Sequence, residues 1–143
     1  MSDVNILLVE DNEGDIILTK EALSDAKIIN GLTVVRDGEE AIKYLNIAKN
    51  GKPELLPDLI LLDINLPKID GKEVLVFIKN DIFLKEIPVV MLTTSSSEMD
   101  INDAYEKNAN CFIIKPVDLY KIFEIVKMIE NFWINIVKLP VKE

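Results

Sequence analysis

The sequence predicts an α/β domain in which helices alternate with the strands of a single parallel sheet. Three observations support this fold class. The chain has 143 residues, the size of one ordinary domain. Its strand-like segments are nearly continuous aliphatic runs, which is typical of strands covered on both faces. Segments with helical spacing lie between these runs, and this alternation predicts right-handed crossovers in a doubly wound sheet.

Five aliphatic runs are predicted to form the sheet. None of them alternates between apolar and polar side chains, so each is expected to be buried on both faces. In chain order they are VNILLV at 4–9, LTVV at 32–35, LILL at 59–62, IPVVML at 87–92 and CFII at 111–114.

Apolar residues at helical spacing predict five helices between and after the strands. They cover residues 14–27, 38–48, 71–79, 99–108 and 118–136. The apolar stripes of the first three consist of Ile17, Leu18, Ala22 and Ala26; of Ala41, Ile42, Leu45 and Ala48; and of Val74, Leu75 and Ile78. Asp100 and Asp118 are the predicted N-caps of the last two. Two prolines in NGKPELLPD, at 50–58, exclude a helix there.

The charge balance argues against a nucleic-acid partner. Sixteen basic residues face 25 acidic ones, which gives a net charge of -9. Affinity for nucleic acid comes largely from cations that neutralise phosphates, and the sequence has no basic cluster. A positively charged protein surface or a bound cation suits this chain better.

The residue inventory also excludes several kinds of chemistry and location. Without histidine the chain has no Ser-His-Asp or Cys-His catalysis and no His-ligated zinc, so a phosphohistidine would have to come from another protein. Cys111 is the only cysteine, and in CFII it is expected to be a small buried apolar residue. The start MSDVNILLVED lacks the basic region of a signal peptide, and no apolar run approaches the roughly 20 residues of a membrane span. We therefore expect a cytoplasmic protein with no membrane partner.

We single out the polar residues that follow the first, third, fourth and fifth predicted strands. In a doubly wound sheet, ligands bind beyond the carboxyl ends of the strands, so these residues are expected to converge at one edge. They are Glu10 and Asp11 after the first run, Asp63 after the third, Thr93 and Thr94 after the fourth, and Lys115 and Pro116 after the fifth.

Three carboxylates at one edge require a cation. At ~4 Å and an effective dielectric of ~20, each like-charge pair costs about 4 kcal/mol. Oxygen ligands without His or a ligating Cys favour a hard cation, and Mg²⁺ fits best because it shares an oxygen with a phosphate. Lys115, followed by Pro116 in a constrained turn, is the expected ammonium partner. These parts fit one reaction, in which Asp63 attacks a phosphoryl group and becomes an acyl phosphate.

Four motifs carry a resemblance to a known family. LLVEDN, LILLDINLPKIDG, IPVVMLTTS and CFIIKP resemble the receiver domain of bacterial two-component response regulators, and the likeness covers about residues 4 to 130. It implies a flavodoxin-like sheet with strand order 2-1-3-4-5, flanked by five helices. It also implies a sensor histidine kinase as phosphodonor.

The resemblance assigns roles to individual residues. Asp63 is the phosphoacceptor, and Asp11 and Asp63 give carboxylates to Mg²⁺. Glu10 acts mainly through a metal-bound water, and Asn65 contributes its backbone carbonyl. Thr93 and Lys115 bind the phosphoryl group.

Further residues are expected to take part in switching and in setting the lifetime of the phosphate. Thr93, the hydroxyl after the fourth strand, is expected to move inward while the aromatic Phe112 changes rotamer. Many members of the family that the chain resembles have Tyr at the position of Phe112, whereas Phe112 has no hydroxyl to form a hydrogen bond. The side chains of Asn65 and Thr94 are expected to flank the path of the attacking water.

Structural alternatives exist for these residues. Asp63 alone could be a strand-end cap, Glu10 and Asp11 could begin a turn, and Phe112 could be plain core packing. Among functions, a haloacid-dehalogenase-type phosphatase also uses a strand-end Asp, Mg²⁺ and a Lys. It typically has a second Asp as general acid two residues later, where this chain has Asn65. A degenerate receiver that signals without phosphate is a third alternative, which the complete set of site residues argues against.

The last predicted helix has more apolar surface than a helix lying on a sheet needs. The apolar positions are Leu119, Ile122, Ile125, Val126, Met128, Ile129, Phe132, Trp133, Ile136 and Val137. The surplus is covered either by the tail VKLPVKE or by a second copy in a C2 homodimer, and we favour the homodimer.

The same region extends the resemblance. ENFWINIVKLP and EDNEGDIILTKEAL are similar to the single-domain regulators that pair with phytochrome-type histidine kinases. We therefore expect residues 1–143 to be one stand-alone receiver domain, with about 131–143 forming an extension of the last helix plus a tail.

Overall fold

One parallel sheet organises the described part of the molecule. The computed structural model describes residues 4–24, 29–93, 111–114 and 124. Its strands are β1 (Val4–Val9), β2 (Ile29–Val35), β3 (Leu59–Asp63), β4 (Val89–Thr93) and β5 (Cys111–Ile114). They run parallel in the order β2-β1-β3-β4-β5, which confirms the predicted sheet.

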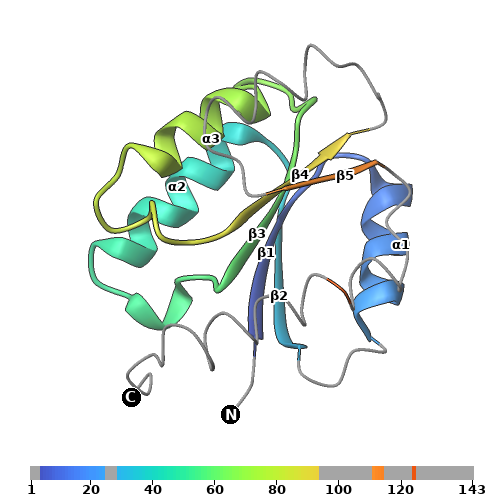
Figure 1. The fold of residues 1–143 in the computed structure, drawn as a ribbon, viewed down its shortest axis with the longest axis horizontal. Coiled ribbons are helices and arrows are strands. Elements are labelled where there is room, and N and C mark those ends of the chain that lie inside the picture. Colours follow the sequence, from blue (N-terminus) through green and yellow to red (C-terminus); the bar gives the residue numbers. More distant parts are fainter. Residues whose placement is uncertain (1–3, 25–28, 94–110, 115–123, 125–143) are drawn as a thin grey trace.

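The helices lie on both faces of this sheet. They are α1 (Glu13–Ser24), α2 (Gly38–Lys49) and α3 (Gly71–Lys79), with a single 3-10 turn, η1 (Pro53–Leu55), in the predicted helix-free linker. Figure 1 shows α1 on one face, and α2 and α3 side by side on the other. The predicted helices at 99–108 and 118–136, with their caps Asp100 and Asp118, lie outside the described residues, apart from the helical Glu124.

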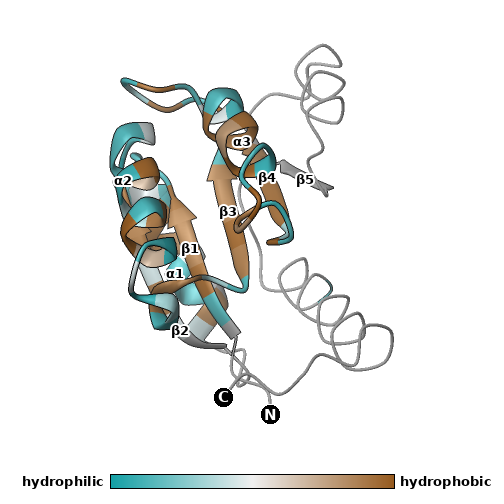
Figure 2. Ribbon diagram, turned by 90° about the vertical axis from the view of Figure 1, so that its left-hand side faces the viewer, coloured by the Kyte–Doolittle hydropathy of each residue, from teal (hydrophilic) through white to brown (hydrophobic). Residues whose placement is uncertain are grey.

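The strand β3 lies in the middle of the hydrophobic core. Every residue from Leu59 to Leu62 has 0% exposure, as expected for a central strand covered on both faces. Figure 2 shows the continuous apolar colouring along β3 and β4. The largest core cluster lies between the sheet and the pair α2 and α3. It comprises Leu7, Val9, Val35, Ala41, Leu45, Ile60, Leu62, Ile64, Val74, Leu75, Ile78, Leu84, Ile87, Val89 and Met91.

The predicted start of the second strand was wrong. β2 begins at Ile29, three residues before the predicted Leu32. Asn30 and Gly31 have turn composition, which hid the extension. The strand pairing explains why such residues occur here. The register with β1 shifts at this point: Val4 pairs with Ile29 and Asn5 pairs with Gly31, so Asn30 is skipped.

The predicted apolar stripe of α1 was wrong at Ile17 and Leu18, while the side chains of Ala22 and Ala26 lie outside the described residues. Ile17 and Leu18 are 49% and 47% exposed, whereas Ile16, Thr19 and Leu23 are buried. The buried residues keep the 3-4 spacing of a helix face, but the hydroxyl of Thr19 disguised the stripe. That hydroxyl donates to the Asp15 carbonyl at 2.8 Å, which satisfies it inside the helix. The buried stripes of α2 and α3 are confirmed at Ala41, Leu45 and Ala48 and at Val74, Leu75 and Ile78.

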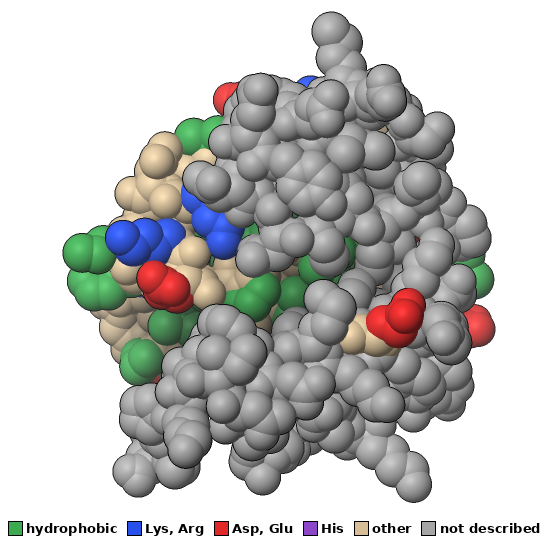
Figure 3. All heavy atoms as spheres, in the orientation of Figure 1, with side chains coloured by type: hydrophobic (Ala, Val, Ile, Leu, Met, Phe, Trp, Pro, Cys, Tyr) green, Lys and Arg blue, Asp and Glu red, His purple; other side chains and the backbone are tan. Residues whose placement is uncertain are grey.

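Other large apolar side chains are exposed near α2 and the segment that follows α3. Ile47 is 49% exposed, and Ile82 and Phe83 are 72% and 70% exposed. Figure 3 shows hydrophobic side chains beside basic and acidic ones at this edge of the molecule. Among the described helices, none combines the length and apolar character needed to span a bilayer.

Candidate functional site

The parallel register aligns the ends of β2, β1 and β3, which are neighbours in the sheet. Val9 of β1 pairs with Val35 of β2 and with Leu62 of β3. The next residue of each strand therefore stands at the same edge of the sheet. Glu10 continues the ladder, since its N–H donates to the Val35 carbonyl at 3.0 Å.

Three carboxylates meet at this edge, as the sequence predicted. One carboxylate oxygen from each of Glu10, Asp11 and Asp63 lies within 4.8 Å of the other two. Glu10 is 0% exposed and Asp63 is 3% exposed, while Asp11 is exposed. Two buried acids and one exposed acid form a cluster that opens to solvent through Asp11.

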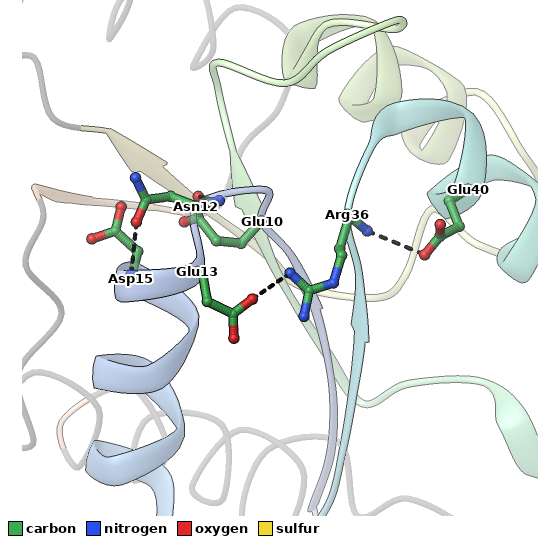
Figure 4. Close-up of polar contacts among 6 residues, drawn as sticks. All are labelled: Glu10, Asn12, Glu13, Asp15, Arg36 and Glu40. Atoms are coloured by element: carbon green, nitrogen blue, oxygen red, sulfur yellow. Dashed lines mark hydrogen bonds and ion pairs between the residues drawn. The ribbon is translucent and has the colours of Figure 1, made fainter.

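Backbone hydrogen bonds orient the two buried acids. Asp63 Oδ1 accepts from the N–H of Asn65 at 3.1 Å, and Glu10 Oε2 accepts from the N–H of Asn12 at 3.3 Å. Asn12 directly precedes α1, and its side-chain oxygen accepts from the N–H of Asp15 in the first turn of that helix at 2.9 Å (Figure 4). The start of α1 is thus tied to the same edge of the sheet.

A glycine permits the turn that follows Asp63. An ideal Cβ on Gly71 would lie 2.1 Å from the backbone oxygen of Asp63, so only glycine allows α3 to begin this close to β3. The Gly71 N–H donates to the Ile64 carbonyl at 3.0 Å, which closes the loop 64–70. Asp70 caps α3 by accepting from the N–H of Lys72 at 2.6 Å.

Arg36 is a feature of this edge that sequence reasoning missed. It is the only arginine in the chain and directly follows β2. Its Nη1 lies 2.7 Å from Glu13 Oε1 in the first turn of α1, and its N–H donates to Glu40 Oε1 at 3.2 Å (Figure 4). Its place directly after a strand was the sequence signal that could have identified it.

The remaining predicted site residues belong to β4 and β5, to the positions that directly follow these strands in the chain, and to the loop after β3. Thr93 ends β4 and pairs through its backbone with Ile114, and Phe112 pairs with Met91. The side chains of Thr93 and Phe112, and all of Thr94, Lys115 and Pro116, lie outside the described residues. Asn65 is among the described residues. It lies two residues after Asp63, and it is exposed to solvent.

The donor set of the acid cluster fits a hard divalent cation. Its members offer only carboxylate oxygens, which Mg²⁺ prefers over softer ligands. With oxygens no more than 4.8 Å apart, two of these charges repel each other by about 3 kcal/mol at an effective dielectric of ~20. A divalent cation among them would turn this repulsion into attraction.

Comparisons with known proteins agree with this arrangement. Residues 6–127 match the family described as "Response regulator receiver domain". The response regulator Rcp1 of Synechocystis sp. is 45% identical over 135 residues, which is 94% of this chain and 92% of that protein.

Two solved structures are similar over nearly the whole chain. The Mn²⁺-bound form of the response regulator Rcp1 has a TM-score of 0.73 at 45% identity and covers 96% of this chain and 99% of its own. The phosphorylated cyanobacterial phytochrome response regulator RcpA has a TM-score of 0.76 at 45% identity and covers 99% of this chain and 100% of its own.

Proposed function

This chain belongs to the response regulator receiver domain family, and from that premise we propose that Asp63 is the aspartate on which it is phosphorylated. As a response regulator it accepts a phosphoryl group on an aspartate and is not an enzyme that turns over an outside substrate. The family match also sets aside the haloacid-dehalogenase-type phosphatase. The observation that supports Asp63 best is its position at the end of buried β3, within 4.8 Å of Glu10 and Asp11 through carboxylate oxygens.

In the proposed reaction, Asp63 is the nucleophile. A carboxylate oxygen attacks the phosphorus atom of a phosphohistidine on the partner kinase, forming a P–O bond while the P–N bond to the imidazole breaks. The imidazole leaves with the bonding electron pair and takes up a proton from solvent. The buried backbone of β3 and the N–H of Asn65 hold the carboxylate in a fixed orientation for this attack.

Asp11, Asp63 and the backbone carbonyl of Asn65 are the proposed ligands of Mg²⁺, and Glu10 acts through a water. When bound, this ion would supply positive charge to the phosphoryl oxygens and to the acids themselves. The acidic cluster supports the assignment, as does the Mn²⁺ bound to the similar Rcp1. Mg²⁺ and Mn²⁺ both prefer carboxylate and carbonyl oxygens as ligands, so a site that binds one of them suits the other.

The remaining site residues are proposed from the sequence motifs. Thr93 and Lys115 bind the transferred phosphoryl group, one through a hydroxyl and the other through an ammonium. Pro116 constrains the turn after Lys115, and Phe112 is the aromatic that responds to the switch. Asn65 and Thr94 set the lifetime of the acyl phosphate by flanking the path of water.

The proposed partner is a phytochrome-type histidine kinase in the cytoplasm. The similarity to a phytochrome response regulator at 45% identity supports this choice. A net charge of -9 suits a partner with a positive surface and disfavours nucleic acid. We also propose that residues 1–143 act as a single receiver domain, and that two copies associate through the apolar surplus of residues 119–137.

Incubation with acetyl phosphate and Mg²⁺, followed by intact-mass measurement, tests the assignment of Asp63. Wild type is expected to gain one phosphoryl group and Asp63→Asn none. The matched control is Asp58→Asn, because Asp58 lies just before β3, at its opposite end, and its Oδ2 accepts from the N–H of Asn5 at 2.9 Å. This control should be phosphorylated like wild type, and equal labelling of Asp63→Asn would refute the assignment.

A further inference from the structure

The first turn of α2 contacts the loop that follows Asp63. An ideal Cβ on Gly38 would lie 2.1 Å from the backbone oxygen of Ile69 and 2.7 Å from its Cβ. Real Cβ atoms do not approach other atoms this closely, so the contact exists only because residue 38 is glycine. The backbone of α2 therefore packs directly on the loop 64–70, with no side chain between them.

A pair of ionic contacts joins the same two segments. Lys68 Nζ lies 3.7 Å from Asp37 Oδ2 and 3.6 Å from Glu39 Oε1. Asp37 is the N-cap of α2, and its Oδ1 accepts from the N–H of Glu40 at 2.7 Å. The carboxylate of Asp37 thus caps α2 and also forms an ionic contact with Lys68 in the loop.

The loop itself has an unusual backbone at this point. Lys68 has a φ of 66°, in the left-handed region that non-glycine residues seldom adopt. A residue persists there when its surroundings determine the conformation. The surroundings here are the contacts of Lys68 with Asp37 and Glu39 and of Ile69 with Gly38.

The same loop contains Asn65. Its N–H is bound to Asp63 Oδ1, and the loop is closed by the hydrogen bond from Gly71 to Ile64. The loop that contains Asn65 is consequently held at three places: at Asn65 by Asp63, at its two ends by the closing hydrogen bond, and at Lys68 and Ile69 by the first turn of α2. The first turn of α2 is far in sequence from both Asp11 and Asp63, yet it contacts this loop.

We propose that Asp37 and Gly38 are positioning residues for the metal site. By contacting Lys68 and Ile69, they hold the loop 64–70 in the conformation that keeps the backbone of Asn65 beside Asp63. The inference rests on the proposed function, in which the Asn65 carbonyl is a metal ligand. Residues that orient the ligands of a metal affect its affinity although they do not touch it.

Metal affinity in Gly38→Ala tests the proposal. The variant must displace the Ile69 backbone, so its dissociation constant for Mn²⁺, measured from the free-ion signal by electron paramagnetic resonance, is expected to rise about tenfold. The matched control is Gly31→Ala. Its Cβ would lie 2.6 Å from Asn5 Oδ1, the end of a side chain that can move aside, at the opposite end of the sheet. It should therefore leave the Mn²⁺ affinity unchanged.

The possible results separate the proposals. Unchanged Mn²⁺ affinity in a folded Gly38→Ala overturns the positioning role, and so does an equal loss in Gly31→Ala. If wild type binds Mn²⁺ no better than Asp63→Asn, the metal site itself is absent and both proposals fall. Binding of Mn²⁺ without phosphorylation by acetyl phosphate counts against the proposed function alone.

A second variant covers the case in which Gly38→Ala does not fold. The double variant Asp37→Asn/Lys68→Gly keeps an N-cap acceptor, removes the ionic contacts and gives residue 68 the freedom of glycine. Its dissociation constant for Mn²⁺ should rise about two- to fivefold, the range of an exposed ion pair. An unchanged constant in this variant overturns the proposal as well.

Discussion

Asp63 ends a strand whose other residues are fully buried, and it is itself only 3% exposed. Its Oδ1 accepts from the N–H of Asn65 at 3.1 Å. Two other carboxylates have oxygens within 4.8 Å of its own, and like charges at this distance repel each other. The stability of the metal-free protein is therefore reduced by the very residues that create its affinity for a cation.

Neutralising Asp63 should stabilise the metal-free protein. Asp63→Asn keeps an oxygen that accepts from the Asn65 N–H but removes one charge from the cluster. Two charges at this separation repel by about 3 kcal/mol, and part of this is relaxed by solvent at Asp11. We expect a gain of about 1–2 kcal/mol in the free energy of unfolding, seen as a melting temperature about 2–8 °C higher.

Magnesium should reverse the order of the two proteins. A ligand at a hundredfold excess over its dissociation constant stabilises the fold by about 2.7 kcal/mol, so wild type should gain this in Mg²⁺ while Asp63→Asn gains little. Asp58→Asn should respond to Mg²⁺ like wild type. A metal-free Asp63→Asn that melts below wild type would contradict the expected repulsion.

The segment between α3 and β4 has no regular structure, yet side chains fix both of its ends. Asp81 forms an ion pair with Lys49 at the end of α2, and its Oδ1 accepts from the N–H groups of Phe83 and Leu84 at 2.8 and 3.1 Å. Lys79 Nζ donates to the carbonyls of Lys85 and Ile87 at 3.1 and 3.0 Å.

These contacts have consequences for ionisation. The hydrogen bond from Lys49 lowers the pKa of Asp81, with burial opposing it. Burial lowers the pKa of Lys79, with the charge of Glu86 opposing it. Asp81 within the segment and Lys79 at the end of α3 thus both have pKa values that depend on the fold.

Asp81→Asn should destabilise the protein in a pH-dependent way. Because the pKa of Asp81 is lower in the folded chain than in the unfolded chain, its charge stabilises the fold above the unfolded value, and this contribution is lost as pH falls through the folded value. The variant should lose about 1–2 kcal/mol of unfolding free energy at about pH 7. The difference in unfolding free energy between the variant and wild type should become smaller below about pH 4.

Urea unfolding at several pH values measures this difference. Glu54→Gln is the control, since Glu54 is an exposed acid in η1, and its effect should stay within about 0.5 kcal/mol. A difference between Asp81→Asn and wild type that stays constant through acid pH would show that the charge of Asp81 is not the cause.

Across the whole molecule, the sequence allowed the sheet and the acid cluster to be predicted for the same reason. Continuous aliphatic runs identify central parallel strands, and parallel strands bring the residues that follow them to one edge. Glu10, Asp11 and Asp63 could therefore be grouped before any coordinates were known. The prediction failed where a polar residue interrupted a buried stripe, as Thr19 does in α1, or where a bulge imitated a turn, as at Asn30 and Gly31.

Contacts between elements were not predictable in this way. The packing of Gly38 on Ile69 and the ion pairs of Lys68 depend on how α2 lies against the loop 64–70, and no periodicity in the chain encodes that distance. Arg36 likewise became recognisable only when its contact with Glu13 was seen. Local pattern determines which residues reach the edge of the sheet, and tertiary packing determines how they are held.

Self-association concerns the molecule as a whole. Within residues 119–137, the apolar set given above would cover more than half the circumference of a helix, beyond the stripe that packing on one sheet uses. Sedimentation should show two chains per particle for wild type. Phe132→Glu should give single chains, because a charge in an apolar interface is costly.

Lys127→Glu is the matched control for sedimentation. It also changes charge by introducing a glutamate in the same segment, but at a position outside the apolar set. This control should remain paired. A wild type that sediments as single chains would instead favour the tail VKLPVKE as the cover of the apolar surplus.

The strand order has a consequence for how the protein becomes functional during synthesis. β1 pairs with both β2 and β3, although residues 10–58 separate β1 from β3 in the chain. No two neighbouring strands can close as a hairpin, so each pairing must wait for a crossover segment to leave the ribosome. Glu10 and Asp11 emerge early but meet Asp63 only after the third strand has docked. The three acids therefore come together only in the assembled sheet, after β1 and β3 have paired.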